Sequence, residues 1–364
     1  MGRQPQLYFD NNATAPLRPE AIAAMRDAMG PPSNPSSVHG FGRAARMAVE
    51  AARDEVAMLA GCRGADVVFT SGGTEANNLV LSAFDRVITS AIEHDSVLQA
   101  APEATFIGVD GEGRIDLDAL RGAVADIPDE ARDRTLVSVM YANNETGVVQ
   151  PIAEVVAIAK DAGLATHSDM VQILGKRHLD FAALGLDYAS LSAHKIGGPT
   201  GVGALLVQPG RRMTSLLRGG GQEQGRRSGT ENFLGIAGFG AAANAAFDSV
   251  GRYRDMARWR DEFESRVLGG RDDVRLFGAG ADRLPNTSCL AIGERSAETL
   301  VMALDLAGVA ISAGAACSSG KVHESHVLKA MKVGDAAGRG IRISAGWNTD
   351  EADFERLAEH LLAL

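Results

Sequence analysis

The sequence predicts an α/β fold in which helices cover both faces of a mainly parallel sheet. Between about residues 40 and 210, apolar or β-branched runs that are typical of strands alternate with helix-like segments. These runs are DVVFT, RVITS, TFIGV, TLVSVMY, LATHS, DYASL and GVGALLV. A helical period runs through GRAARMAVEAARDEVAMLAG and stops at Gly61, a residue type that commonly ends helices. Because ligands of such sheets bind beyond the carboxyl ends of the strands, the polar residues that follow each run are candidates for a site.

The pattern changes after about residue 250, where the long helix-like segment RYRDMARWRDEFESRVLGG begins a different arrangement. Shorter runs follow, among them TSCLAI, GVAIS and RGIRISAG, and the helix-like DEADFERLAEHLLAL ends the sequence. This part predicts a smaller α/β domain. A chain of 364 residues is also longer than one core usually accommodates, so we expect two domains.

Composition limits the classes of partner. Apolar residues make up 45% of the chain and charged residues 23%, which is ordinary for a globular protein. The formal charge of −10 disfavours a nucleic-acid partner, because such binders usually present a basic surface to the phosphates. No apolar run approaches the roughly 20 residues that a membrane-spanning helix needs, so we expect no membrane partner.

Cysteine usage indicates the compartment. Cys62, Cys289 and Cys317 are widely spaced, odd in number and without a CxxC pattern, which favours a reducing environment. The segment MGRQPQLYFDNNAT has no apolar stretch of the kind found in signal peptides. We therefore expect a cytoplasmic enzyme, and we predict no metal ligands.

The first motif that carries chemistry is VVFTSGGTEANN, in which Gly72, Gly73 and Thr74 follow a strand and open a helix. Free amides at a helix N-terminus bind anions, and glycines let the backbone approach them closely. A plain strand-turn-helix with Thr74 as a capping residue explains the same letters equally well.

The second motif is DYASLSAHKIGGPTGVGALLV, which places Ser192, His194 and Lys195 between a strand and a glycine-rich loop. A lysine at a buried strand end is able to form a Schiff base if burial lowers its pKa. Ser192 and His194 are both able to donate to a phosphate, which favours a site over a surface lysine.

The third motif is LATHSDMVQILGK, in which Asp169 comes just after a strand and Gln172 lies three residues later, on the same side of a turn. An Asp against a pyridine nitrogen keeps that nitrogen protonated, which makes pyridoxal phosphate an electron sink. A helix-capping Asp is the alternative.

The fourth motif is AISAGAACSSGKVHESHVLKAM, which surrounds Cys317 with small and polar residues. A thiol on such a segment is able to move between a substrate and an acceptor if its thiolate is accessible. Cys62 follows a helix-ending glycine and Cys289 lies in a strand-like run, so we expect them to be an ordinary surface residue and a core residue.

Taken in order, YFDNNATAP, NPSSVHG, FTSGGTEANN, EHDSV, NNETG, HSDMVQ, SAHKIGGPTGVG, RSGTEN, AACSSG and IRIS resemble the cysteine desulfurases of the NifS/IscS type over the whole chain. The resemblance implies a pyridoxal-phosphate enzyme of fold type I with a large seven-stranded sheet domain and a smaller α/β domain. We expect the large cofactor-binding domain over 14–250. The small domain would combine 1–13 with 251–364 and carry the cysteine loop.

The resemblance also implies a role for each matching residue around the cofactor ring. Lys195 would bind pyridoxal 5′-phosphate covalently and carry a proton between the cofactor and the substrate, and His94 of EHDSV would stack on the ring. Asp169 would pair with the pyridine nitrogen, while Gln172 and Asn144 would approach the phenolic oxygen.

Further roles concern the phosphate and the substrate. The implied phosphate ligands are Gly73, Thr74, Ser192, His194 and, from a second subunit, Thr230. That last ligand implies a homodimer. Arg342 of RGIRISAG would bind the substrate carboxylate, because a guanidinium suits bidentate binding, with Asn34 of NPSSVHG beside it. A strand-edge ion pair is the alternative for Arg342.

The implied reaction takes sulfur from L-cysteine, giving L-alanine and a persulfide on Cys317. The spacing after Cys317 matches the NifS/IscS group rather than the SufS-like group, and implies a flexible loop and direct transfer to an acceptor such as an iron-sulfur scaffold protein. Alternatives are a selenocysteine lyase or an aminotransferase of the same fold, or an inactive sulfur-transfer partner. A Rossmann dehydrogenase is disfavoured because no GxGxxG follows the first strand.

Overall fold

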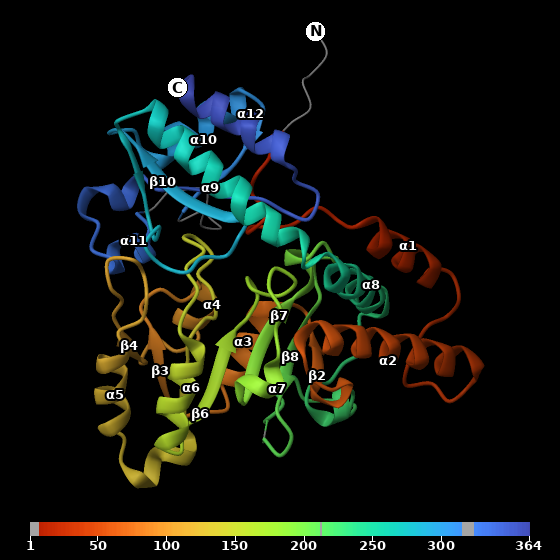
Figure 1. Cartoon of the computed structure of the whole chain (residues 1–364). Coiled ribbons are helices and arrows are strands. Elements are labelled where there is room, and N and C mark those ends of the chain that lie inside the picture. The colour runs from red at the N-terminus through yellow and green to blue at the C-terminus, as the bar shows by residue number, and fades with distance from the viewer. Residues whose placement is uncertain (1–6, 212, 315–323) are drawn as a thin grey trace.

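The computed structural model describes residues 7–211, 213–314 and 324–364. A large twisted sheet with helices on both faces forms one part of the molecule, and the C-terminal third lies at one end of it together with the N-terminal strand (Figure 1). The predicted α/β class is confirmed.

The large sheet has seven strands in the order β2-β8-β7-β6-β5-β3-β4. They are β2 (Val67–Thr70), β3 (Arg86–Ser90), β4 (Thr105–Ile107), β5 (Thr135–Ser138), β6 (Ala165–Asp169), β7 (Tyr188–Ser192) and β8 (Gly203–Val207). Only β8 is antiparallel to its neighbours, β2 and β7. Each strand coincides with one of the runs expected from the sequence. Nearly every residue of these strands is buried, as expected where both faces of a mainly parallel sheet are covered.

Helices cover the sheet on both sides. They are α1 (Pro19–Ala28), α2 (Gly40–Ala60), α3 (Gly73–Leu81), α4 (Asp95–Leu98), α5 (Leu117–Ala125), α6 (Ile152–Asp161), α7 (Phe181–Leu184) and α8 (Phe233–Ser249). One apolar cluster joins α2, α5, α6 and α8 to one set of alternating strand residues, such as Val67 and Phe69. A second cluster joins α3 and α4 to the other set, such as Val68. This alternation is the period of two that a pleated strand imposes.

Helix α2 ends where the sequence predicts. Gly61 has φ +67°, the left-handed conformation that favours glycine, and its N–H donates to backbone oxygens of the last turn. A Cβ on Gly61 would also lie 2.5 Å from the Cα of Asp180.

The C-terminal part has its own sheet and helices. Strands β9 (Val274–Leu276), β10 (Thr287–Ile292), β12 (Ser312–Ala313) and β13 (Ile341–Ser344) form an antiparallel sheet, and β1 (Leu7–Tyr8) pairs with β11 (Val309–Ala310). The helices are α9 (Arg252–Gly270), α10 (Ala297–Leu306), α11 (His326–Ala330) and α12 (Glu351–Leu362). Short 3-10 helices are η1 (Gly64–Asp66), η2 (Asp129–Arg134), η3 (Ala193–Lys195), η4 (Glu223–Gly225) and η5 (Gly334–Gly338).

A separate apolar core joins the two ends of the chain. Leu7 and Phe9 pack with residues between Tyr253 and Leu361, whereas Val250 belongs to the core of the large sheet. These contacts agree with a small domain made from both chain ends, and the boundaries at residues 13 and 250 stay predictions.

Within the part of the chain that the structure describes, no single helix is both long and apolar enough to span a membrane. The pair α8 and α9 meets the length and composition requirement only when taken together, and it is bent by 68°.

Candidate active site

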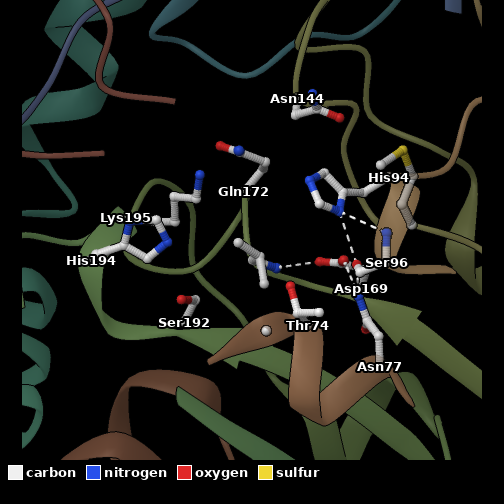
Figure 2. A pocket seen from close by; sticks show the side chains of 13 residues that line it. Thr74, Asn77, His94, Ser96, Asn144, Asp169, Gln172, Ser192, His194 and Lys195 are labelled. Carbon is white, nitrogen blue, oxygen red and sulfur yellow. Dashed lines mark hydrogen bonds between the residues drawn. The ribbon is translucent and has the colours of Figure 1, made fainter. Parts of the chain in front are cut away.

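Polar side chains meet at the carboxyl edge of the large sheet, as expected for an α/β fold. Strands β6 and β7 end at Asp169 and Ser192, and α3 begins at Gly73 shortly after β2 ends. They border a cavity of about 250 Å³ (Figure 2). Its lining comprises Gly73, Thr74, Asn77, His94, Ser96, Met140, Asn144, Asp169, Val171, Gln172, Ser192, His194 and Lys195.

One end of the cavity is suited to binding an anion. Helix α3 directs its N-terminus here through Gly73 and Thr74, and Ser192 and His194 lie nearby. A Cβ on Gly73 would come within 2.8 Å of Cγ2 of Val171, so only glycine leaves this approach open. Burial and the charge of Lys195 lower the pKa of His194 to about 4, so its imidazole is neutral at neutral pH.

Asp169 is held as an acceptor at the floor of the cavity. Its Oδ1 accepts from the backbone N–H of Val171 at 3.0 Å, and its Oδ2 accepts from Nδ2 of Asn77 at 2.8 Å. Two donors stabilise the charged carboxylate, which is able to hold a proton on a partner nitrogen.

Two polar residues that line the first cavity, Asn77 and Ser96, were not predicted from the sequence. The Asn77 amide donates both to Asp169 and to Oγ of Ser96, the latter at 2.8 Å, and Oγ of Ser96 lies 2.8 Å from Nδ1 of His94. Both residues lie inside quoted motifs, GTEANN and EHDSV. Asn77 stands one helical turn after Gly73, and this spacing was the signal available for it.

His94 presents an N–H to the cavity. The backbone N–H of Ser96 donates to Nδ1 of His94 at 3.1 Å, so Nδ1 acts as an acceptor and the proton of the neutral ring lies on Nε2. Figure 2 shows that nitrogen on the cavity side, with Lys195 on the opposite side and Gln172 between them.

Lys195 is a largely buried amine at the end of η3. Its Nζ donates to the backbone oxygens of Asn12 at 2.5 Å and Ala13 at 2.8 Å. Burial is the main cause that lowers the pKa of Lys195 to about 8, and the charge of Arg342 lowers it further while Asp169 opposes the shift. A sizeable neutral fraction is therefore available as a nucleophile near neutral pH.

A second cavity of about 290 Å³ adjoins the first and shares His94, Asn144, Gln172 and Lys195 with it. The rest of its lining is Asn12, Ala13, Asp95, Glu145, Gly314, His326 and Arg342. The two cavities form one site, because four side chains belong to both.

Arg342 projects from β13 into this second cavity. Its Nη2 donates to Oδ1 of Asp10 at 2.7 Å and its Nη1 to the backbone oxygen of Asn144 at 3.2 Å. Its Nε is buried and has no partner among the described residues. An oriented guanidinium with a donor left over is suited to binding a carboxylate.

Two predicted residues are not brought to either cavity within one chain. Asn34 is exposed in the loop between α1 and α2, and its Oδ1 accepts from the backbone N–H of Ser36 at 2.9 Å. Thr230 is exposed in the segment before α8. Neither lines a cavity with Arg342 or with the α3 N-terminus. Their roles stay predictions.

The predicted nucleophile Cys317 lies outside the described residues. Gly314 and His326, which line the second cavity, stand on either side of the undescribed residues 315–323. The other two cysteines are unsuited to nucleophilic chemistry: burial raises the pKa of Cys62 to about 12 and that of Cys289 further still. Cys289 is fully buried as expected, and Cys62 is half-buried. No group of His, Cys, Asp or Glu in the described part of the chain is arranged to hold a metal ion.

The chain is similar over its whole length to proteins of known class. The family model "Aminotransferase class-V" matches residues 7–357. The sequence is 42% identical to a cysteine desulfurase of Cereibacter sphaeroides, over 98% of this chain and 95% of that protein.

Solved structures agree with the sequence comparison. A NifS-like protein from Rickettsia africae superposes with a TM-score of 0.91 at 35% identity, covering 99% of this chain and all of that one (100%). SspA in complex with cysteine superposes with a TM-score of 0.76 at 28% identity, over 93% of this chain and 98% of that one. The chain therefore belongs to the aminotransferase class-V family and, within it, to the cysteine desulfurases, which depend on pyridoxal 5′-phosphate.

Proposed function

We propose that this protein removes sulfur from L-cysteine, leaving L-alanine and a persulfide on Cys317, with pyridoxal 5′-phosphate as its cofactor. One observation carries the proposal. A lysine of lowered pKa faces His94 across a cavity that has a helix N-terminus at one end and a fixed carboxylate in its floor.

The residues present fit the cofactor at each of its groups. The α3 N-terminus with Ser192 and His194 suits the phosphate, and glycine is required at position 73 because a Cβ there would lie 2.8 Å from Cγ2 of Val171. Asp169 suits the pyridine nitrogen, because the hydrogen bonds that its two oxygens accept hold the carboxylate in one orientation in the floor of the cavity. The Gln172 amide suits the phenolic oxygen.

When bound, pyridoxal phosphate acts as an electron sink for the bonds at the α-carbon of an amino acid attached to it. Asp169 holds the proton on the ring nitrogen that this sink requires. Lys195 would hold the cofactor covalently, and its free Nζ would be the base that takes the α-proton and the acid that later returns a proton. A pKa of about 8 suits both directions of transfer near neutral pH.

His94 orients the reacting groups. Because its Nδ1 is occupied by the N–H of Ser96, its Nε2–H is the group able to donate toward the cofactor or substrate. The Ser96 hydroxyl lies 2.8 Å from Nδ1 and, together with the Ser96 N–H, holds the ring in this orientation.

Arg342 binds the substrate carboxylate. Asp10 and the backbone oxygen of Asn144 fix two of its nitrogens, which leaves Nε as a buried donor for a carboxylate oxygen. The second cavity joins this guanidinium to Lys195, so a small α-amino acid bound here presents its α-carbon to the lysine.

Cys317 completes the reaction as the nucleophile. Its thiolate attacks the sulfur of the substrate; an S–S bond forms, the C–S bond breaks and the electron pair of that bond passes to the carbon side. Protonation of the carbon then gives alanine. Cysteine and one protein thiol become alanine and one persulfide, so the step needs no external oxidant or reductant.

Product analysis tests the proposal directly. The purified protein is incubated with L-cysteine and dithiothreitol, and sulfide and alanine are measured together; we expect equal amounts of both. In Cys317→Ser neither product should form beyond a trace.

Other outcomes point to the other activities of this fold. Protein that binds the cofactor and makes neither product is not a desulfurase. Alanine formed independently of Cys317 indicates a lyase. Transfer of the substrate's amino group to a keto acid indicates an aminotransferase.

A homodimer is part of the proposal. Large apolar side chains are exposed around α1 and α2, among them Met29, Val38, Phe41 and Met47, with 58% or more of each residue's surface exposed. Thr230 and Asn34, which have no place in the cavities of one chain, are candidates to complete the site of a second copy. Light scattering gives the oligomeric state, and mixed dimers of Thr230→Val with Lys195→Ala should regain the activity of one site.

The destination of the sulfur is also a proposal. The resemblance to the NifS/IscS type supports delivery to an acceptor protein for iron-sulfur cluster assembly. The small number of cysteines supports a reducing, cytoplasmic location. Transfer of radiolabelled sulfur from the persulfide to a purified scaffold protein tests the delivery. Fractionation of cells tests the location.

A further inference from the structure

Lys176 is a second buried lysine beside the site. It lies four residues after Gln172, is 2% exposed, and its Nζ donates to Oε1 of Gln172 at 3.0 Å and to Oδ1 of Asn12 at 3.1 Å. Burial is the main cause that lowers its pKa well below the ordinary value, and the charges of Lys195 and Arg342 add to it. Its two bonded partners among the described residues are amide oxygens, and a buried amine in such a setting is costly to keep.

Asn12 connects Lys176 to the catalytic lysine. Its backbone oxygen accepts from Nε2 of Gln172 at 3.1 Å and from Nζ of Lys195 at 2.5 Å, while its side-chain oxygen accepts from Lys176. Its Nδ2 donates to Oγ1 of Thr287 at 2.9 Å, which fixes the direction of the amide. Lys176, Gln172 and Lys195 therefore all hydrogen-bond to the same residue.

Lys176 and the backbone oxygen of Asn12 together set which end of the Gln172 amide faces the cavity. An amine donates its hydrogens, so Oε1 of Gln172 must turn toward Lys176 and Nε2 toward Asn12 and the cavity. One of the two Nε2 hydrogens is used on Asn12, and the other remains for a ligand. Without Lys176, only the backbone oxygen of Asn12 would still select this orientation, and the flipped amide would present an acceptor to the ligand.

We propose that Lys176 is a positioning residue of the active site: it holds the Gln172 amide in the orientation that donates a hydrogen bond to the phenolic oxygen of the cofactor. The inference rests on the proposed function for the identity of the ligand. It adds a residue that touches neither cofactor nor substrate, and it assigns Gln172 the role of donor rather than acceptor.

The test is a double-mutant cycle with cofactor binding as the readout. Lys176→Met removes the donors and keeps the length of the side chain. We expect the dissociation constant of pyridoxal phosphate, titrated into the full-length chain after removal of the bound cofactor, to rise about tenfold, because the buried Oε1 of Gln172 loses the donor that holds it. The absorption maximum of the bound cofactor should shift as well.

In the Gln172→Leu background the same substitution should have an effect of less than about twofold, because Lys176 acts through Gln172. Equal effects of Lys176→Met in both backgrounds, or an unchanged dissociation constant and spectrum, would overturn the inference. Lys160→Met, the same change at an exposed lysine of α6, is the matched control and should alter neither quantity.

A second variant guards against a folding defect. Lys176→Gln keeps N–H donors. Its dissociation constant for pyridoxal phosphate should stay within about threefold of the wild-type value, and the absorption spectrum of the bound cofactor should not shift. If Lys176→Met does not fold, Lys176→Gln takes its place in the cycle. A loss of affinity for pyridoxal phosphate that is as large in the Gln172→Leu background as in the wild type then counts against the inference. Sulfide and alanine are measured on the wild type in parallel: their absence alongside a non-additive cycle refutes the proposed function and leaves the role of Lys176 intact.

Discussion

Asn77 donates a hydrogen bond of 2.8 Å from its side-chain nitrogen to Oδ2 of Asp169, ninety-two residues later in the chain. The same nitrogen donates to Ser96, which in turn holds Nδ1 of His94. One fully buried amide therefore sets both the acceptor in the floor of the cavity and the imidazole at its side. A carboxylate fixed in this way is already arranged for the charge that it must stabilise.

Replacing Asn77 by Ala should reduce turnover about tenfold or more, because Asp169 loses a buried donor and His94 loses its indirect support. The cofactor should also bind more weakly. Asn78→Ala is the matched control: Asn78 is the next residue of the same helix, and its side chain donates to backbone oxygens, at 2.9 Å to Thr74. Steady-state kinetics at saturating cofactor separates the two variants. Equal losses in both would mean that the helix, rather than the Asp169 contact, is what matters.

Lys195 makes the stability of the cofactor-free protein depend on pH. Its pKa is about 8 in the folded protein and 10.5 in an unconstrained lysine, so between these values the unfolded chain binds more protons than the folded one. Stability from this group therefore rises as the pH rises from about 8 to 10.5, and is lowest below that window.

Lys195→Met removes this dependence. At about pH 7 the cofactor-free variant should be more stable than the cofactor-free wild type by at most about 3 kcal/mol, less the loss of two hydrogen bonds, and the gain should shrink as the pH approaches 10. Urea unfolding across this range measures the difference. A gain that is constant with pH would show that Lys195 keeps an ordinary pKa. Lys160→Met, at the surface, should give no pH-dependent gain.

Arg342→Lys should raise KM for L-cysteine about tenfold or more and change kcat far less, because a lysine replaces a fork of donors with a single ammonium. The hydrogen bond to Asp10 orients the Arg342 guanidinium, and its Nε has no partner among the described residues and is left for the substrate. Arg339→Lys is the control. Arg339 lies three residues before Arg342 in the sequence and forms an ion pair with the exposed Glu294. If kcat falls instead of KM rising, Arg342 does not bind the ground-state carboxylate.

The sheet was predictable because its signal is local. Each strand lies in a short run of apolar or β-branched residues, mostly bounded by turn-forming residues, and such a run is visible without knowing which strands will be its neighbours. The residues that follow strands, Asp169, Ser192 and Lys195, were found by the same argument. Resemblance supplied their roles and also those of His94 and Arg342.

Contacts between distant segments were not predictable in this way. Asn12 and Lys176 lie within quoted segments, YFDNNATAP and LATHSDMVQILGK, yet nothing in their local sequence indicates that their side chains meet across 164 positions. Asn77 is a similar case. Such pairs depend on how helices and strands pack, and the sequence of one segment contains only half of the information. Asn34 and Thr230 are a different case, because neither residue lines a cavity of the single chain, where their predicted roles would require them to be.

Gly73→Ala tests the anion site at the start of α3. The added Cβ would lie 2.8 Å from Cγ2 of Val171, and Val171 carries the N–H that holds Asp169 at 3.0 Å. The valine must therefore move, and the disturbance reaches both the phosphate end and the ring end of the site. We expect the dissociation constant of pyridoxal phosphate to rise about tenfold.

The second substitution Val171→Ala should restore most of that loss, because it removes the methyl group that the new Cβ meets. Gly122→Ala in α5 is the control: nothing lies within 4 Å of its added Cβ, and alanine in a helix interior should stabilise the protein by about 0.5–1 kcal/mol without changing cofactor binding. Fluorescence titration with the cofactor and thermal unfolding give the two quantities. A Gly73→Ala protein that Val171→Ala fails to rescue would place the defect in the backbone of the α3 N-terminus and not in the collision with Val171.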